Sequence, residues 1–153
     1  MTVPPSSTLN APVVDCLDCQ AVSALYPGIS ACPVCGSQWL EVRYDYDALS
    51  VRLLDCLKNR TFDLWRYREL LPITDSNAGI SMGEGGTPLI PAPNLGMMLG
   101  LPNIILKDER QGPTNSFKDR QAAVCIAALK EAGITEAVLA STGNVAIAFS
   151  AYA

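Results

Sequence analysis

Two closely spaced pairs of cysteines constrain the fold of this chain more than any other feature of its sequence. Cys16 and Cys19 form one C-x2-C pair, and a second pair, Cys32 and Cys35, follows after twelve residues. A C-x2-C turn directs two thiolates toward one point, so two such turns supply the four ligands of a tetrahedral Zn2+ site. We therefore predict a structural zinc ribbon over residues 13–46, with no open metal position for catalysis. The alternatives are a redox-active pair or four unrelated thiols.

The charges of the chain argue against a nucleic acid as partner. Over residues 13–46 a single basic residue, Arg43, stands among four acidic ones, and the whole chain has a net charge of -4. Such a surface repels the phosphates of nucleic acids and of anionic lipids. We therefore expect the ribbon to dock against the rest of the protein.

Neither a membrane span nor a secretory signal is expected from the sequence. No segment has the roughly 18 uninterrupted apolar residues that a membrane-spanning helix needs. The N-terminal residues also lack the basic and apolar regions of a signal peptide. We therefore expect a protein of the reducing cytoplasm without a membrane partner, where paired cysteines favour a metal over disulfides.

The chain contains no histidine, which narrows the chemistry that it can perform. A Ser-His-Asp triad, a Cys-His pair and a histidine-ligated metal are all excluded for a site built from this chain alone. A general base must therefore be a carboxylate, a lysine, a cysteine or a tyrosine.

The first half of the chain divides where its composition changes. Residues 1–12 are rich in proline, serine and threonine, which predicts a flexible tail. Aromatic and β-branched residues predict a strand over residues 39–46. Residues 47–79 predict a helical connector, with apolar residues at helical spacing over 47–58 and a shorter helix over 63–71 that a proline ends.

The sequence of residues 80–153 predicts strands that alternate with helices. Short apolar strands are expected over residues 103–107 and 137–140, and a helix follows each, over 116–132 and after residue 144. This order predicts an α/β fold with a parallel sheet. The last helix lacks a C-cap and two strands make an incomplete sheet, so we expect the N-terminal piece of a longer protein.

Lys118 is the strongest catalytic candidate. It lies in the first turn of the helix predicted over residues 116–132, among unpaired amides and at the positive end of the helix dipole. A positive potential disfavours an ammonium and favours the neutral amine that attacks an aldehyde. Ser116 and Asp119 have the spacing of a capping box around it. The alternative is a surface lysine that pairs with Asp119 or Glu109.

A second candidate is the turn formed by Ser141, Thr142, Gly143 and Asn144, between the predicted strand 137–140 and the last helix. Ligands of open α/β sheets bind at the carboxyl ends of strands. Amides and hydroxyls that converge there would hold a carboxylate or a phosphate. The alternative is an ordinary helix N-cap.

Three motifs follow one another along the second half of the chain. They are GEGGTPL at residues 83–89, KDERQGPTNSFKDRQAA at residues 107–123 and STGN at residues 141–144. In this order they resemble the E-G-x-T-P-L motif, the lysine motif and the asparagine loop of threonine synthase and its relatives. These are the tryptophan-synthase-β-like, fold type II enzymes that depend on pyridoxal phosphate, and some also carry a four-cysteine module. The resemblance implies that residues 80–153 begin such a catalytic domain, an open parallel sheet with flanking helices.

The resemblance implies a role for each matching residue. Lys118 would form a Schiff base with pyridoxal phosphate and then move protons, while Phe117 and Asp119 would flank and orient it. Asn144 would hydrogen-bond to the phenolic oxygen of the cofactor. The residues implied at the substrate are Ser141, Thr142 and Gly143, which would hold its α-carboxylate, and Thr87, which would line its side.

The resemblance also implies a reaction, the conversion of O-phosphohomoserine and water to threonine and phosphate by a homodimeric lyase. The chain by itself should be inactive, because the family's glycine-rich phosphate loop and ring-nitrogen partner would lie beyond Ala153. Asn115 stands where the family has a glycine, and asparagine tolerates the left-handed conformation that such a loop needs.

Two alternatives to this reaction remain open at the level of the sequence. One is a related pyridoxal-phosphate enzyme of α,β-elimination or replacement, such as threonine dehydratase or cysteate synthase. The other is a zinc-ribbon interaction module joined to an α/β domain without enzymatic activity.

Overall fold

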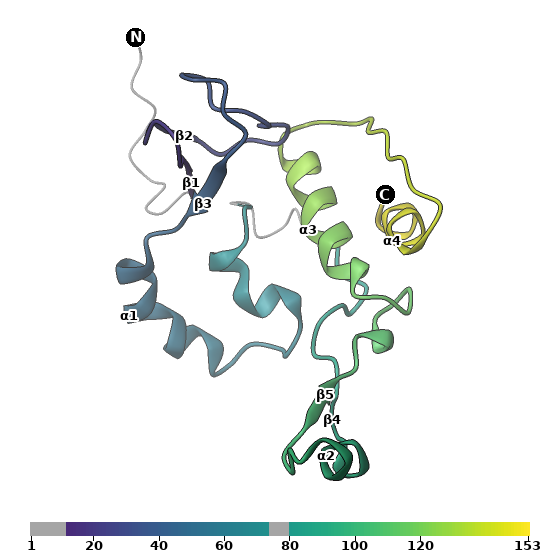
Figure 1. Ribbon diagram of the computed structural model, residues 1–153. Helices are drawn as coiled ribbons and strands as arrows, with labels where there is room; N and C mark the ends of the chain where they lie inside the picture. Colours follow the sequence, from purple (N-terminus) through teal and green to yellow (C-terminus); the bar gives the residue numbers. More distant parts are fainter. Residues whose placement is uncertain (1–11, 74–79) are drawn as a thin grey trace.

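The computed structural model describes residues 12–73 and 80–153, which form a mixed α/β structure of two small sheets and several helices (Figure 1). Among residues 12–73 and 80–153, none of the helices has the combination of length and hydrophobicity that a membrane span requires. The predicted tail, apart from Pro12, and residues 74–79 of the predicted connector lie outside these ranges. The elements in chain order are β1 (Val13–Cys16), β2 (Val22–Ala24), β3 (Leu40–Arg43), α1 (Tyr46–Leu57), the 3-10 helix η1 (Leu64–Leu70), β4 (Leu89–Pro91), α2 (Pro93–Leu99), β5 (Ile105–Lys107), the 3-10 helix η2 (Glu109–Gln111), α3 (Lys118–Glu131) and α4 (Asn144–Tyr152).

The N-terminal sheet is antiparallel, with strand order β2-β1-β3. Val14 on the central strand is buried, and the Arg43 side chain donates two hydrogen bonds, of 2.5 and 3.1 Å, to the Asp15 carboxylate. The strand predicted over residues 39–46 is confirmed over Leu40–Arg43, which is β3, but Tyr46 already begins α1. The sheet brings the two cysteine pairs together because Cys16 ends β1 and lies opposite Leu40 of β3.

The helix predicted over residues 47–58 is confirmed, and the helix predicted over residues 63–71 is corrected in detail. Helix α1 matches the helix predicted over residues 47–58, and the Asp45 carboxylate caps it by accepting a backbone N–H of its first turn at 3.0 Å. The segment 63–71 forms the 3-10 helix η1, which is distorted at Tyr67, where φ is -107°. A helix this short is often completed with i→i+3 hydrogen bonds.

Helices α3 and α4 lie side by side and form the main core (Figure 1). Ala122 and Ala123 of α3 face Ala148 and Tyr152 of α4, and all four are at most 1% exposed. Alanines leave room for the two backbones to approach closely, so the tyrosine ring is the one large side chain among these four core residues.

Helix α3 ends as its sequence predicts. Gly133 adopts a φ of +70°, and its N–H donates to the carbonyl of Lys130 at 3.0 Å. The N–H of Ile134 donates to the carbonyl of Leu129 at 2.9 Å. This pair of hydrogen bonds is a Schellman motif, which needs a residue that tolerates positive φ.

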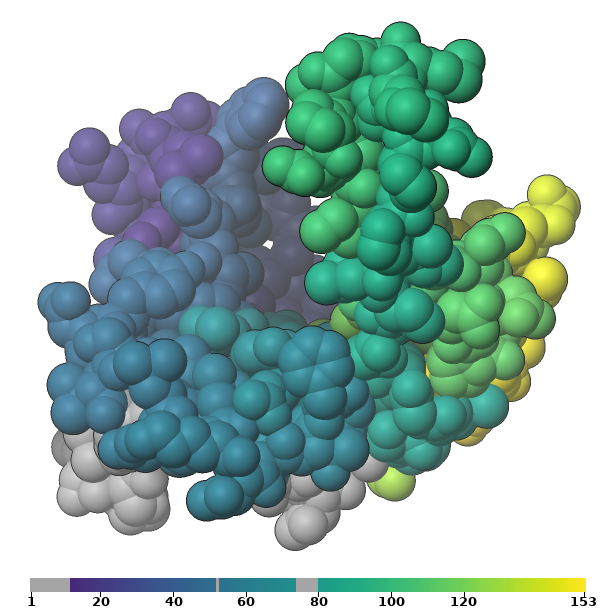
Figure 2. Space-filling view, turned by 90° about the horizontal axis from the view of Figure 1, so that it is seen from below, coloured from purple at the N-terminus to yellow at the C-terminus, as the bar shows by residue number. Residues whose placement is uncertain are grey.

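The parallel sheet predicted for residues 80–153 is wrong for this chain. Strand β5, within the segment predicted as a strand, pairs antiparallel with β4, in the register Leu89 opposite Lys107. Residues 137–140 form no strand, and Val138 is fully exposed. The β4 strand is the nearer partner in sequence, so a short loop with α2 closes this hairpin at lower entropic cost. The hairpin and α2 protrude from the body of the molecule (Figures 1 and 2).

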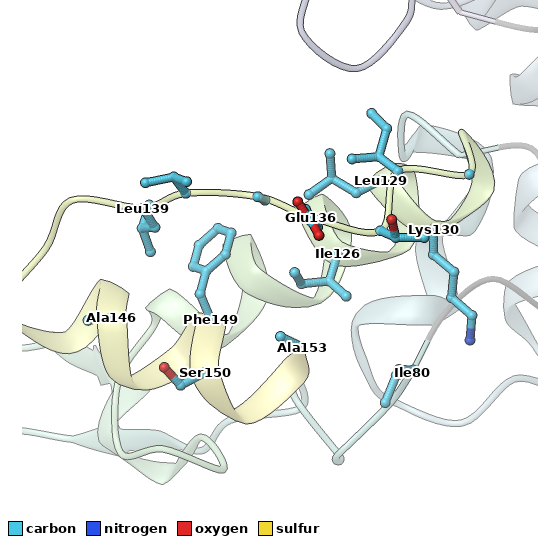
Figure 3. A pocket seen from close by; sticks show the side chains of 15 residues that line it. Ile80, Ile126, Leu129, Lys130, Glu136, Leu139, Ala146, Phe149, Ser150 and Ala153 are labelled. Carbon is cyan, nitrogen blue, oxygen red and sulfur yellow. The ribbon is translucent and has the colours of Figure 1, made fainter.

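An apolar groove lies where the second parallel strand was expected. It has a volume of about 1070 Å³ and is lined by both helices and by the connection between them. Figure 3 shows Ile126 and Leu129 of α3, Phe149 of α4 and Leu139 of the connection around it. The groove is lined mainly by aliphatic and aromatic side chains, so it is not the candidate for chemistry.

Two glycines of the GEGGTPL motif allow a matched test of close packing. Gly83 and Gly85 have nearly equal φ angles of +90° and +95°. A Cβ on Gly85 would lie 2.3 Å from the backbone nitrogen of Leu64, whereas a Cβ on Gly83 would meet no atom within 4 Å. The two positions therefore share backbone strain and differ in steric contact.

We expect Gly85→Ala to lower the free energy of unfolding by about 3–5 kcal/mol, because backbone strain and overlap with η1 add together. Gly83→Ala should cost only about 1–2 kcal/mol, the strain alone. Chemical denaturation followed by circular dichroism measures both values. Equal losses in the two variants would contradict the packing of this turn against η1.

Candidate active site and metal centre

The Sγ atoms of the four cysteines converge on one point. All four lie within 4.8 Å of one another, and the Cys16–Cys35 and Cys19–Cys32 pairs are both 3.6 Å apart. Four sulfurs bonded to one Zn2+ at 2.3 Å would stand about 3.8 Å apart in a tetrahedron, whereas disulfide sulfurs are about 2.05 Å apart. The donor set and its spacing therefore fit a tetrathiolate metal site.

The two cysteine turns have the same backbone hydrogen bonds. The N–H of Gln20 donates to the carbonyl of Cys16, and the N–H of Gly36 donates to the carbonyl of Cys32, both at 2.9 Å. Gln20 and Gly36 each follow a C-x2-C pair and have φ angles of +61° and +76°. The geometry that gathers the thiolates therefore requires a left-handed residue after each pair.

We expect Gln20→Gly to raise the free energy of unfolding by about 0.5–1 kcal/mol. A left-handed conformation strains glutamine but not glycine, so the substitution relieves strain in the folded state. Part of this gain is lost because glycine has a larger conformational entropy in the unfolded chain. Urea denaturation at saturating zinc measures the change. The converse variant, Gly36→Gln, should be destabilised, and a loss of stability in Gln20→Gly would contradict the common turn geometry.

Backbone amides already favour one of the four thiolates. The N–H groups of Cys35 and Val34 lower the pKa of Cys32 to about 6. The backbone N–H of Ser37 acts to lower the pKa of Cys35, but the Cys19 thiol and burial outweigh it and raise this pKa to about 12. A cation is therefore needed to keep all four sulfurs deprotonated together.

Lys118 and Asn144 begin the two packed helices α3 and α4. A pocket of about 610 Å³ is lined by Asn115, Ser116 and Phe117, which precede α3, and by Asn144. The Lys118 Nζ lies 4.4 Å from the centroid of the Phe117 ring, so it lies beside a residue that lines the pocket. The structure therefore brings the lysine motif and the asparagine loop to one depression of the size of a small-molecule site.

The other residues of the asparagine loop do not line this pocket. Ser141 Oγ accepts a hydrogen bond from the Gly143 N–H at 3.3 Å, and Thr142 is exposed. Their hydroxyls and amides therefore lie at the start of α4, next to the pocket-lining Asn144. No side-chain cap holds the first turn of α4, so the alternative of an ordinary N-cap finds no support in the described residues.

The capping box predicted at the lysine helix is not formed. The Ser116 Oγ accepts the Lys118 N–H at 3.2 Å, but the Asp119 carboxylate accepts the backbone N–H and the hydroxyl of Thr114, at 2.9 and 2.5 Å. Asp119 is 1% exposed and thus anchors the loop before the lysine. Gly112 is required for this approach, since a Cβ there would lie 2.5 Å from Asp119 Oδ2.

The loop before Lys118 also confirms the expected conformation of Asn115, whose φ is +60°. Asparagine tolerates this region because its short side chain can hydrogen-bond locally. The loop therefore adopts a left-handed residue at this position without a glycine.

Thr87 is buried and does not line the pocket, but it belongs to a partly buried ionic network whose Glu109 does line it. Its hydroxyl donates to Glu109 Oε1 at 2.6 Å and accepts from Arg120, which holds both Glu109 oxygens at 2.8 and 2.9 Å. The hydrogen bonds from Arg120, and to a lesser extent the one from Thr87, outweigh the effect of burial and lower the pKa of Glu109 to about 2. Glu109 and Asp119 thus bind groups other than Lys118. The sequence analysis missed the Glu109–Arg120 ion pair, although the opposite charges of the DER and KDR triplets are visible in the sequence.

Comparisons with known proteins agree with these motifs. Residues 80–153 match the family described as pyridoxal-phosphate dependent enzyme. A threonine synthase from Methanocaldococcus jannaschii is 39% identical over 114 residues, which are 74% of this chain and 28% of the relative. One from Methanosarcina acetivorans is 33% identical over 137 residues, 90% of this chain and 33% of the relative. The chain thus spans no more than about a third of the length of these curated relatives.

Proposed function

The chain belongs to the pyridoxal-phosphate dependent enzyme family, and from this premise we propose that its whole protein converts O-phosphohomoserine and water to threonine and phosphate. The observation that carries the proposal is the pocket lined by Phe117 and Asn144, with the Lys118 amine 4.4 Å from the centroid of the Phe117 ring. The relatives that are named threonine synthase support this choice of reaction within the family.

The residues around the pocket fit pyridoxal phosphate by the chemistry of their donors. The cofactor has an aldehyde that an amine can attack, and the Lys118 amine lies 4.4 Å from the ring of the pocket-lining Phe117. The Asn144 amide is exposed at the pocket and can hydrogen-bond to an aromatic oxygen. A volume of about 610 Å³ accommodates a molecule of this size.

When bound, pyridoxal phosphate supplies an electron sink that stabilises negative charge on substrate carbons. Lys118 would hold the cofactor and, once released, move protons between neighbouring carbons of the substrate. Asn144 would orient the cofactor, and the Ser141–Gly143 turn would bind the substrate α-carboxylate. This division of labour needs no histidine, and the chain has none.

We further propose that the four cysteines hold a structural Zn2+ and that residues 13–46 and 80–153 are separate domains. The donor set and the sulfur spacing support the metal. A homodimer in the cytoplasm with an amino acid as substrate completes the proposal. Thr87 would act on the substrate side through the Glu109–Arg120 network that holds it.

The proposal is tested by incubating the full-length protein and pyridoxal phosphate with three substrates in turn. O-phosphohomoserine should release phosphate and yield threonine, whereas threonine and O-phosphoserine should be stable. Conversion of threonine to a keto acid would replace the proposal by a dehydratase. Release of phosphate from O-phosphoserine alone would replace it by an α,β-elimination or replacement enzyme.

A further inference from the structure

Glu84 is a carboxylate buried at 0% exposure outside the candidate pocket. It accepts three hydrogen bonds, from Trp65 Nε1 at 2.6 Å, from the Met82 backbone N–H at 2.9 Å and from the Tyr152 hydroxyl at 2.8 Å. A buried carboxylate is tolerated when donors replace the water that it loses, and charge-assisted hydrogen bonds of this kind are strong. The three hydrogen bonds therefore hold the Glu84 carboxylate in one position.

The three donors come from three separate parts of the chain. Trp65 belongs to η1, Met82 to the turn that contains Glu84, and Tyr152 to the last turn of α4. The backbone carbonyl of Glu84 also accepts the N–H of Leu64 at 2.9 Å. Burial and the Glu84 carboxylate raise the pKa of Tyr152, so its hydroxyl remains a donor. The glutamate of the GEGGTPL motif thus joins η1 to α4.

The hydrogen bond between Tyr152 and Glu84 affects the pocket because Tyr152 and the pocket-lining Asn144 belong to the same helix, α4. Asn144, Ala148 and Tyr152 are spaced by four residues, so they follow one face of this helix. Ala148, at 0% exposure, packs on the alanines of α3. The helix is about 12 Å long between its first residue and Tyr152 and behaves as a rigid unit over this length. A hydrogen bond at its last turn therefore sets the rotation of the whole helix.

We propose that Glu84 is a positioning residue for Asn144. By accepting the hydrogen bond from the Tyr152 hydroxyl, Glu84 fixes the rotation of α4 about its axis and its position along that axis relative to α3. Asn144 is thereby presented to the pocket that Phe117 also lines. What Asn144 then binds rests on the proposed function, whereas its placement by Glu84 does not.

The proposal is tested on the chain of 153 residues by nuclear magnetic resonance, without cofactor. Tyr152→Phe removes only the hydroxyl, and Glu84→Gln keeps the shape of the acceptor while it introduces a donor. We expect both variants to shift the side-chain amide signals of Asn144 and to speed hydrogen exchange in α4 by about tenfold or more. If Glu84→Gln does not fold, Tyr152→Phe carries the test alone.

Two control variants separate positioning from a general loss of stability. Ile126→Val weakens packing on the same core without touching Glu84, and Glu41→Gln changes an exposed glutamate on β3. Neither should shift the Asn144 side-chain signals. Unchanged Asn144 signals in Tyr152→Phe, or an equal shift in Ile126→Val, would overturn the proposal.

A separate titration with pyridoxal phosphate keeps this test apart from the proposed function. In the full-length protein, Tyr152→Phe should shift the absorption maximum of the bound cofactor in the same direction as Asn144→Ala, by a smaller amount. A wild-type protein that binds no cofactor would contradict the proposed function and leave the resonance result standing. An Asn144→Ala spectrum that moves while the Tyr152→Phe spectrum does not would overturn the positioning role.

Discussion

Replacement of Lys118 by alanine is expected to abolish covalent attachment of pyridoxal phosphate and to lower kcat of the full-length protein by about ten-thousand-fold. The amine has two tasks in the proposed reaction, because it holds the cofactor and moves protons on the substrate, and proton transfer alone is worth up to about ten-thousand-fold. Borohydride reduction followed by peptide mapping measures attachment, and phosphate release from O-phosphohomoserine measures turnover.

The lysine prediction has matched controls within the chain. There are four lysines in the sequence, and Lys58 is an exposed one that pairs with Asp55. Lys58→Ala should therefore leave labelling and turnover unchanged. Lys118→Arg places a guanidinium beside Phe117 that cannot attack an aldehyde, since arginine stays protonated. Reduced cofactor found on another lysine, or full turnover by Lys118→Arg, would refute the assignment.

The sequence predicted those elements whose signals are local. Gly133 follows the predicted end of α3, and Asn115 takes the left-handed conformation expected of it, whereas the Asp45 cap of α1 was not predicted although its signal is equally local. Each of these signals depends on hydrogen bonds within about six residues, which a single sequence displays directly. The turn of each cysteine pair belongs here too, because C-x2-C spacing fixes it locally, whereas the convergence of the two pairs depends on the sheet.

The sequence did not predict the pairing of strands in the second half of the chain. An apolar run such as residues 137–140 has the composition of a buried strand, but composition does not say which partner will cover it. In the described structure β5 pairs with β4, and Val138 remains exposed. Strand pairing is a property of distant segments, so periodicity alone could not decide it.

The candidate site shows the same division between local and distant contacts. The lysine and asparagine motifs identified the residues that begin α3 and α4, and the shared pocket joins them. The partners of Asp119 and Glu84 were missed. Asp119 was expected in a capping box but binds Thr114, and Glu84 was noted only as part of the GEGGTPL motif. Glu84 and Tyr152 are separated by 68 residues, and no local pattern connects them.

Replacement of Cys16 by serine is expected to release one zinc ion per chain and to unfold the ribbon over residues 13–46. Cys16 is 2% exposed at the end of β1, so its loss leaves three thiolates gathered around an incomplete shell. Structural zinc contributes about 10–16 kcal/mol to small zinc-dependent folds near neutral pH, far more than the small β2-β1-β3 sheet can replace. Elemental analysis measures zinc, and circular dichroism measures the ribbon.

Cys56→Ser is the matched control for the zinc prediction, because Cys56 is an exposed cysteine of α1 outside the cluster. It should retain one zinc per chain and the wild-type circular dichroism spectrum.

Cobalt substituted for zinc provides a second measurement of ligation. It should give the charge-transfer bands of a tetrathiolate site in the wild type and in Cys56→Ser, and these bands should be absent in Cys16→Ser. Since thiolates must be deprotonated to bind, acid should release the metal from both proteins that retain it. Unchanged zinc content in Cys16→Ser would refute ligation by four cysteines and leave the ribbon held by its sheet alone.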